Sequence, residues 1–218
     1  MPIAAKGMLL TSMDIDAADE ADFNRWYDRE HIAERVAIDG FVEARRYVAQ
    51  VGSPKYLSLY STATFETLDS PAYRAALANQ TEWSKRNIAR FRNMIRAVAR
   101  ITISRGQGRG AVLGILRLRP IDADKLRPML ALRLDPEMLD GGISMHLLES
   151  DPALSKSLTD DGPGPGAGDW FVLIDATDVT SVARAMALRF DSQELVGAGR
   201  IVSSGIYRLM WDLAKSDL

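Results

Sequence analysis

The sequence of 218 residues contains no cysteine and only two histidines, His31 and His146. Without cysteine the chain has no disulfides, no thiol nucleophile and no thiolate metal ligands. His31 and Glu34 are near enough in sequence to share a metal ion, but the usual ligand sets need a second nearby histidine, which the sequence lacks. We therefore expect no metal site.

Long hydrophobic runs and an excess of one charge are missing too. No apolar run reaches the ~18 residues of a membrane span, and residues 1–13 lack the basic start and the cleavage site of a signal peptide. The formal net charge is -2, with both signs interspersed, whereas a nucleic-acid-binding face is basic. We expect a cytoplasmic protein that binds neither nucleic acid nor a membrane.

The sequence does contain enough apolar residues for a large core, 47% of the chain, and these follow a strand and helix pattern. Phe23, Trp26 and Tyr27 form one helical stripe, and Ser70 followed by Pro71 is typical of a helix start. The elements predicted for the first half are strand 7–14, helix 17–30, strand 41–50, strand 56–65, helix 71–93 and strand 95–104.

The same order of elements repeats after a break at Gly106, Gly108 and Gly110. The second set is strand 111–119, helix 122–140 with interruptions at Pro128 and Pro136, strand 143–148, strand 170–176, helix 180–190 and strand 201–211. We interpret the run 162–168 as a loop.

The repeated order predicts an α+β fold of two tandem ferredoxin-like β-α-β-β-α-β halves, residues 1–105 and 110–218. A four-stranded unit of this kind has helices on one sheet face and leaves the other open. That open face must be covered. We expect the two sheets to pack on each other within one chain as an α/β barrel, and a homodimer is compatible with this.

The densest group of reactive side chains lies in residues 23–41, FNRWYDREHIAERVAIDGF. This segment resembles the motif of the EthD-like family of the dimeric α/β-barrel superfamily: an aromatic pair, a histidine and a Gly-Phe that opens the second strand. Arg46-Tyr47 and residues 81–84 are similar to other stretches of the family, and the resemblance covers roughly residues 5–105. It implies the fold more than a reaction, because most members have no established one.

His31 is the leading candidate for chemistry, since an imidazole titrates near neutral pH and can take or give a proton. Trp26 and Tyr27 would desolvate it, and Glu30 or Glu34 could fix its tautomer. The alternative is a structural histidine that is satisfied at a helix bend. A Phe-Trp-Tyr stripe at helical spacing is also compatible with a plain core.

Side-chain alternation along the strands predicts what faces the barrel interior. Leu57 and Leu59 are assigned to the helices. An arginine and tyrosine lining would suit a carboxylate or phenolate on a flat ligand; alternatively the arginines pair with Glu43 or line a wet contact between the halves. The predicted inward residues are Phe41, Glu43, Arg45 and Tyr47, then Tyr56, Ser58, Tyr60 and Thr62, then Arg96, Val98, Arg100 and Thr102.

These observations predict a cofactor-independent small-molecule enzyme of the lyase, isomerase or cyclase type. It would act on a compact aromatic or polyketide-like anion, with His31 transferring the proton. Two alternatives remain: a non-catalytic binding or accessory protein of a catabolic pathway, and a cofactorless or haem-assisted monooxygenase. Haem occurs in relatives of the superfamily, but two histidines and no recognisable haem pocket favour no cofactor. The predicted site consists of His31 and Tyr47 as catalytic residues and Trp26, Tyr27, Arg45, Tyr60, Trp83 and Arg100 as substrate-binding residues.

Overall fold

The computed structural model describes residues 6–156, 164–190 and 193–218. The first half begins with a strand and continues through a helical region with a central π-helical turn. Its elements are β1 (Gly7–Asp14), α1 (Glu20–Trp26), the π-helical turn (Tyr27–His31), α2 (Ile32–Ala37), β2 (Phe41–Val51), β3 (Tyr56–Thr62), a 3₁₀ turn (Phe65–Asp69), α3 (Pro71–Ala78), α4 (Glu82–Ile88) and β4 (Arg92–Gly106).

The second half repeats this order in a simpler form. Its elements are β5 (Val112–Pro120), α5 (Ala123–Arg133), a 3₁₀ turn (Pro136–Met138), β6 (Gly142–Ser150), β7 (Trp170–Ala176), α6 (Val179–Arg189), a 3₁₀ turn (Gln193–Leu195), β8 (Gly199–Ala214) and a last 3₁₀ turn (Lys215–Asp217).

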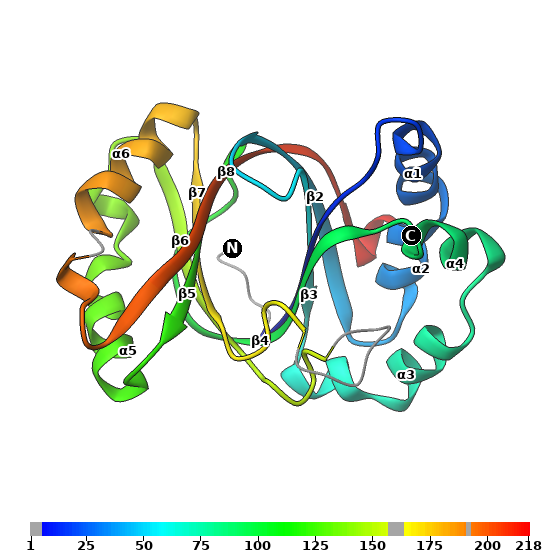
Figure 1. Ribbon diagram of the computed structural model, residues 1–218, viewed down its shortest axis with the longest axis horizontal. Coiled ribbons are helices and arrows are strands. Elements are labelled where there is room, and N and C mark those ends of the chain that lie inside the picture. Colours follow the sequence, from blue (N-terminus) through cyan, green and yellow to red (C-terminus); the bar gives the residue numbers. More distant parts are fainter. Residues whose placement is uncertain (1–5, 157–163, 191–192) are drawn as a thin grey trace.

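The strands close into one antiparallel barrel in the order β1-β3-β2-β8-β5-β7-β6-β4. The four strands of each half are neighbours, and the pairs β2–β8 and β4–β6 join the halves. Helices α1 to α4 cover one side of the barrel, and α5 and α6 cover the opposite side (Figure 1). The predicted fold class is confirmed, while the division into two domains at residues 105 and 110 stays a prediction.

Two predicted helices have different bounds in the structure. The first helix does not end near Glu30 but continues to Ala37 through the π-helical turn. The predicted helix 71–93 is two helices, because Thr81 begins a new one by accepting a 3.0 Å hydrogen bond on its side chain from the backbone N–H of Ser84. This is an ordinary N-cap. Of the predicted loop 162–168, residues 162 and 163 lie outside the described part.

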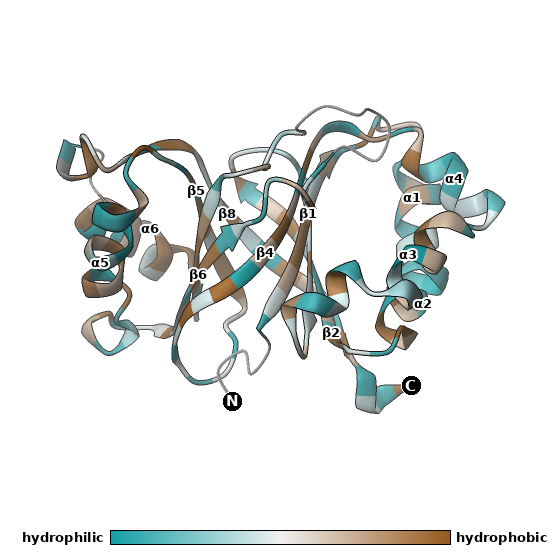
Figure 2. Ribbon diagram, turned by 90° about the horizontal axis from the view of Figure 1, so that it is seen from below, coloured by the Kyte–Doolittle hydropathy of each residue, from teal (hydrophilic) through white to brown (hydrophobic). Residues whose placement is uncertain are grey.

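Apolar side chains from both halves fill the barrel interior, so the opening between the ribbons in Figure 1 is packed. In Figure 2 apolar residues run along the strands and recur on the helices. No helix in residues 6–156, 164–190 and 193–218 is long and apolar enough to cross a membrane. The interior cluster includes Met8, Leu10, Tyr47, Leu57, Leu59, Ala97, Ala99, Leu113, Ile115, Leu148, Phe171, Leu173 and Tyr207.

The prediction of the inward face is right for Glu43, Arg45 and Tyr47 of β2 but wrong for Phe41 and for residues of β3 and β4. Leu57 and Leu59 of β3 point into the barrel. Every residue of β3 is buried, because one face meets the barrel interior and the other meets the helices, so polarity alternation does not distinguish its faces. The side chains predicted inward that instead lie on the helix side include Phe41, Tyr56, Tyr60 and Val98, together with Arg96 and Arg100 on the same face of β4.

Candidate functional site

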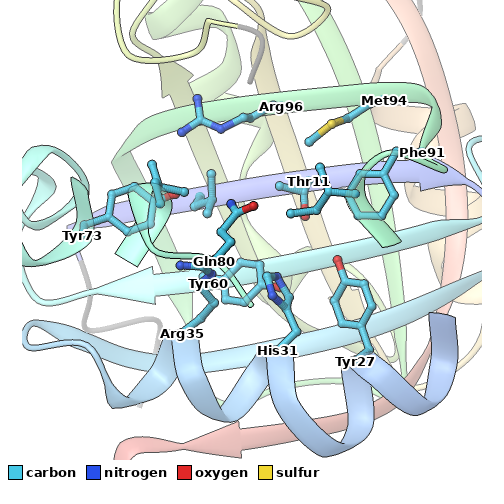
Figure 3. A pocket seen from close by; sticks show the side chains of 13 residues that line it. Thr11, Tyr27, His31, Arg35, Tyr60, Tyr73, Gln80, Phe91, Met94 and Arg96 are labelled. Atoms are coloured by element: carbon cyan, nitrogen blue, oxygen red, sulfur yellow. The ribbon is translucent and has the colours of Figure 1, made fainter. Parts of the chain in front are cut away.

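A partly open cavity of about 40 Å³ lies between the helices of the first half and the outer face of its sheet, outside the barrel (Figure 3). At about 10–15 Å³ per water it has room for about three water molecules. This volume suits a group of carboxylate size and is too small for a whole aromatic ligand. The cavity is lined by Leu9, Thr11, Tyr27, His31, Arg35, Tyr60, Tyr73, Leu77, Gln80, Ile88, Phe91, Met94 and Arg96.

The π-helical turn Tyr27–His31 brings two lining residues to the cavity. The backbone N–H of Ile32 bonds to the carbonyl of Tyr27, five residues earlier. One such turn shifts the register of the helix, so α1 and α2 present different faces to the sheet. Single π-helical turns inside α-helices are frequent at functional sites.

His31 is buried against aromatic rings. Its ring centroid lies 4.2 Å from that of Trp26 and 5.1 Å from that of Tyr27. Its Nδ1 is buried and has no hydrogen-bond partner among the described residues. Burial, with the positive charges of Arg35 and Arg46, holds the pKa of His31 well below its ordinary value. The imidazole is therefore neutral at pH 7 and able to accept a proton.

Glu30 does not fix the tautomer of His31, which was one of the roles predicted for it. Its carboxylate accepts hydrogen bonds from the hydroxyls of Thr81 at 2.6 Å and Ser84 at 3.3 Å. The Ser84 hydroxyl in turn accepts the indole N–H of Trp26 at 3.0 Å. This network fixes the ring that packs on His31 and leaves the Nδ1 of His31 without a partner among the described residues.

Two further polar atoms at the cavity are buried and lack partners in the described part of the chain. They are the Thr11 hydroxyl and the Tyr60 hydroxyl, and the latter has the hydroxyls of Tyr27 and Ser58 as polar neighbours. Burial and the neighbouring Tyr27 phenol raise the pKa of Tyr60 well above its ordinary value, so its hydroxyl stays protonated. Buried polar groups are nearly always hydrogen-bonded, to water if not to protein. Three orphaned groups around one cavity, counting His31, therefore indicate a polar occupant.

Two arginines with little exposure also line the cavity, Arg35 at 5% and Arg96 at 8%. Arg96 donates to the backbone carbonyls of Leu154 at 2.6 Å and Lys156 at 3.3 Å. Within the residues that the structure describes, Arg35 has no hydrogen bond or ion pair, and neither arginine contacts a carboxylate. Both side chains are thus largely buried beside the cavity, and no described residue places a carboxylate in contact with either guanidinium.

Arg45 and Tyr47 lie on the other side of the sheet from His31, inside the barrel. Arg45 is 3.2 Å from a carboxylate oxygen of Glu43 and 3.5 Å from one of Asp175, and it donates to the Tyr47 hydroxyl at 3.3 Å. This arrangement agrees with the alternative that Arg45 pairs with Glu43. Asp175 belongs to the second half, so the ion pair also joins the two halves.

Arg100 and Trp83 lie away from the cavity. The Arg100 side chain is 55% exposed, stacks 3.7 Å from the ring centroid of Phe65 and pairs with Glu66. The indole N–H of Trp83 donates to Asp22 at 3.1 Å, which fastens α4 to α1. Of the predicted site residues, the structure brings together His31, Tyr27 and Tyr60 at the cavity, with Trp26 behind His31, and separates Arg45, Tyr47, Trp83 and Arg100 from them.

Sequence reasoning does not find Thr11, Gln80 or either cavity arginine as site residues. One signal for Arg35 was available, because it follows His31 by four residues and such pairs share a helix face. Arg96 is predicted on the inward face of β4, where it would meet the barrel interior. Gln80 and Thr11 carry no local signal, since they reach the cavity only through the packing of the helices on the sheet.

The whole chain resembles solved structures of the dimeric α/β-barrel fold at low identity. An anthrone oxidase-like protein matches 98% of this chain and 95% of its own, with 12% identity and a TM-score of 0.64. The encapsulated DyP-type peroxidase from Mycobacterium smegmatis matches 96% and 93%, with 8% identity and a TM-score of 0.57. A heme-binding protein from Thermus thermophilus matches 100% and 94%, with 12% identity and a TM-score of 0.52.

No protein-family model matches the chain, and no curated protein matches it. Similarity at these identities establishes the fold alone. The chain therefore has the dimeric α/β-barrel fold, with both ferredoxin-like units in one polypeptide.

Haem, which one neighbour's name mentions, does not fit the two histidines. Ligand pockets usually have about 300–1,000 Å³, whereas the His31 cavity has about 40 Å³. His146 lies inside the barrel, with its two ring nitrogens 3.0 Å and 3.1 Å from the hydroxyls of Ser104 and Ser144. Among the residues described, neither imidazole has an open face for a macrocycle. That part of the chain also contains no cluster of three or more His, Asp or Glu side chains suited to a metal ion.

Proposed function

We propose that the protein is a cofactor-independent small-molecule enzyme that binds an anionic group in the His31 cavity and moves a proton through His31. One observation carries the proposal. Within the described ranges, one cavity is lined by an unpartnered imidazole nitrogen, by the Tyr60 hydroxyl and by the Arg35 side chain, which is 5% exposed and has no ion pair. The motif of residues 23–41 supports assigning the first half to the EthD-like family.

The charge of the cavity favours an anion. A buried charge is costly unless it is paired, and both Arg35 and Arg96 are buried with no carboxylate of the described residues in contact. A ligand carboxylate or enolate would supply the missing counter-charge and the missing hydrogen-bond partners. The anion proposed from the sequence is thus retained, but with Arg35 and Arg96 in place of Arg45 and Arg100.

The geometry suits proton abstraction next to a carbonyl or carboxylate. Neutral His31 would take a proton from carbon, and the electron pair of the C–H bond would move onto the carbonyl oxygen as an enolate. Tyr60 stays protonated and would donate a hydrogen bond to that oxygen, with Arg35 neutralising its charge. An anionic ligand would also offset the arginine charges that lower the pKa of His31, so the base becomes stronger when the substrate binds. His31 would then return the proton to the same or another carbon.

Hydrogen–deuterium exchange at carbon tests the proposal with pyruvate and acetoacetate in D₂O, followed by NMR. We expect the protein to accelerate exchange and His31→Gln to lower the rate by ~10²–10⁴-fold, the usual contribution of a general base, with anion affinity little changed. Arg100→Gln, remote from the cavity, should behave like wild type. Binding without exchange would instead assign the protein to the non-catalytic binding class. If the protein shows neither binding nor exchange, the proposed site is refuted.

A further inference from the structure

An open groove of about 560 Å³ lies on the surface between α3 and α4, beside the His31 cavity. The cavity and the groove share three lining residues, Leu77, Gln80 and Ile88. These residues form the wall between the two spaces, which we call the neck. Figure 3 shows Gln80 among the side chains that line the cavity. The cavity and the groove therefore adjoin at these three side chains.

The groove suits an uncharged, apolar body. Its remaining lining residues are Ala78, Ala89, Arg74 and Lys85. The two cations already have partners: Arg74 pairs with Asp69 at 2.6 Å and Lys85 with Glu82 at 2.7 Å. Its volume falls within the range of small-molecule sites, about 300–1,000 Å³. The adjoining cavity holds only a group of carboxylate size.

The α4 side of the groove is firmly attached to the rest of the fold. Trp26 bonds to Ser84, Trp83 bonds to Asp22, and Arg90 bonds to Asp22 at 2.9 Å. Gln80 lies in the α3–α4 link and is the polar residue of the neck, between Leu77 of α3 and Ile88 of α4.

We propose that the ligand has a head and a tail: its anionic head enters the His31 cavity, and its apolar body lies in the groove between α3 and α4. Gln80 at the neck determines which head groups enter. This inference rests on the proposed anion site and adds the substrate class, an anion with an apolar body, and a specificity-determining residue.

Binding of acetate, hexanoate and octanoate to the full chain tests the tail, measured by NMR titration and calorimetry. A fully buried methylene contributes about fourfold in affinity. In a half-open groove we expect octanoate to bind at least about tenfold more tightly than acetate. Equal affinities would overturn the inference and leave the anion site standing. A failure of all three carboxylates to bind would refute the proposed anion site itself.

Two tryptophan variants on α3 separate the groove from general effects. Ala78→Trp fills the groove and should abolish the gain of octanoate over acetate while acetate still binds. Ala75→Trp changes an equally exposed alanine of the same helix that does not line the groove, and it should keep the gain. If both variants behave alike, the tail does not lie in the groove.

Gln80→Ala tests the neck. With a wider neck we expect pivalate, whose head is branched, to bind at least about tenfold more tightly than to wild type, while acetate affinity changes less than about threefold. This comparison does not depend on protein stability, because both ligands are measured on the same folded variant. Unchanged pivalate binding would remove Gln80 as the specificity-determining residue.

Discussion

The imidazole of His31 packs on the indole of Trp26 with ring centroids 4.2 Å apart and planes inclined by 31°. The Trp26 N–H is held by Ser84, and Ser84 and Thr81 bond to Glu30. The first turn of α4 thus positions the ring that desolvates His31. The polar network around His31 acts on its aromatic neighbour and leaves its own Nδ1 without a partner among the described residues.

Neither histidine should titrate between pH 8 and pH 5. Burial, with nearby arginine charge, lowers the pKa of His31 well below its usual value and that of His146 to about 3. With only two histidines in the chain, imidazole NMR signals can be assigned from His31→Gln and His146→Gln. We expect both imidazoles to keep the NMR chemical shifts of the neutral form between pH 8 and pH 5. A midpoint near 6.5 for His31 would contradict the buried, neutral state.

The same pKa shifts predict loss of stability in acid. When the pKa of a histidine is depressed in the folded state, the unfolded state takes up the proton at a higher pH than the folded state. The contribution of that histidine to stability is therefore present above about pH 6.5 and is lost as the pH falls. Each such histidine contributes a slope of about 1.4 kcal/mol per pH unit. Asp175, whose pKa burial raises, acts with the opposite sign at lower pH. The free energy of unfolding, measured with urea at pH 6.0 and 5.0, should therefore fall less between these two pH values for His31→Gln than for wild type.

Removing the hydroxyl of Ser84 should destabilise the fold. Ser84→Ala leaves the buried N–H of Trp26 without its acceptor, and an unsatisfied buried donor costs about 1–3 kcal/mol. Urea unfolding measures the free-energy change, and Ser216→Ala, in the exposed last turn, is the control. If the two variants lose equal stability, the Ser84–Trp26 bond contributes nothing.

The sequence predicted the architecture well because the fold depends on element order. It predicted the site only in part because the site depends on which face of a strand each side chain occupies. On β2 the predicted face of Arg45 and Tyr47 was right. On β3 it was wrong for Tyr60, since both faces of that strand are buried and the large aromatic residues go to the helix layer. This difference moves Tyr60 to His31 and leaves Arg45 inside the barrel.

Replacing Arg35 should remove the response of the protein to anions without unfolding it. Arg35 is buried without an ion pair in the described residues, so Arg35→Met removes an uncompensated charge and should leave the unliganded protein at least as stable. Thermal unfolding with 0 and about 100 mM formate measures the response. A ligand that binds only the folded state stabilises it by mass action. We expect stabilisation of wild type and of the Arg100→Gln control, and none for Arg35→Met. If Arg35→Met instead loses much of its stability and formate still restores that stability, this role of Arg35 is contradicted.

The ion pair of Arg45 and Asp175 connects the two halves inside the barrel and should be strongly coupled. Both side chains are 1% exposed, with Arg45 Nη1 3.5 Å from Asp175 Oδ1. Arg45→Met leaves the buried carboxylate without its cation, and breaking one partner of a buried pair typically costs ~3–5 kcal/mol. The double variant with Asp175→Asn should cost less than the sum of the single variants.

The pH dependence and an exposed control pair distinguish this coupling from a general packing defect. Burial already raises the pKa of Asp175, and loss of Arg45 raises it further, so the folded variant takes up a proton as the pH falls. The cost of Arg45→Met should therefore be smaller at pH 5 than at pH 8. The pair Arg74 and Asp69, 2.6 Å apart but exposed, should show little coupling, because solvent screens surface ion pairs. Two results would mean that the charge of Arg45 is not what joins the halves. One is an equal coupling energy for the buried pair and the exposed pair, and the other is a cost of Arg45→Met that does not change with pH.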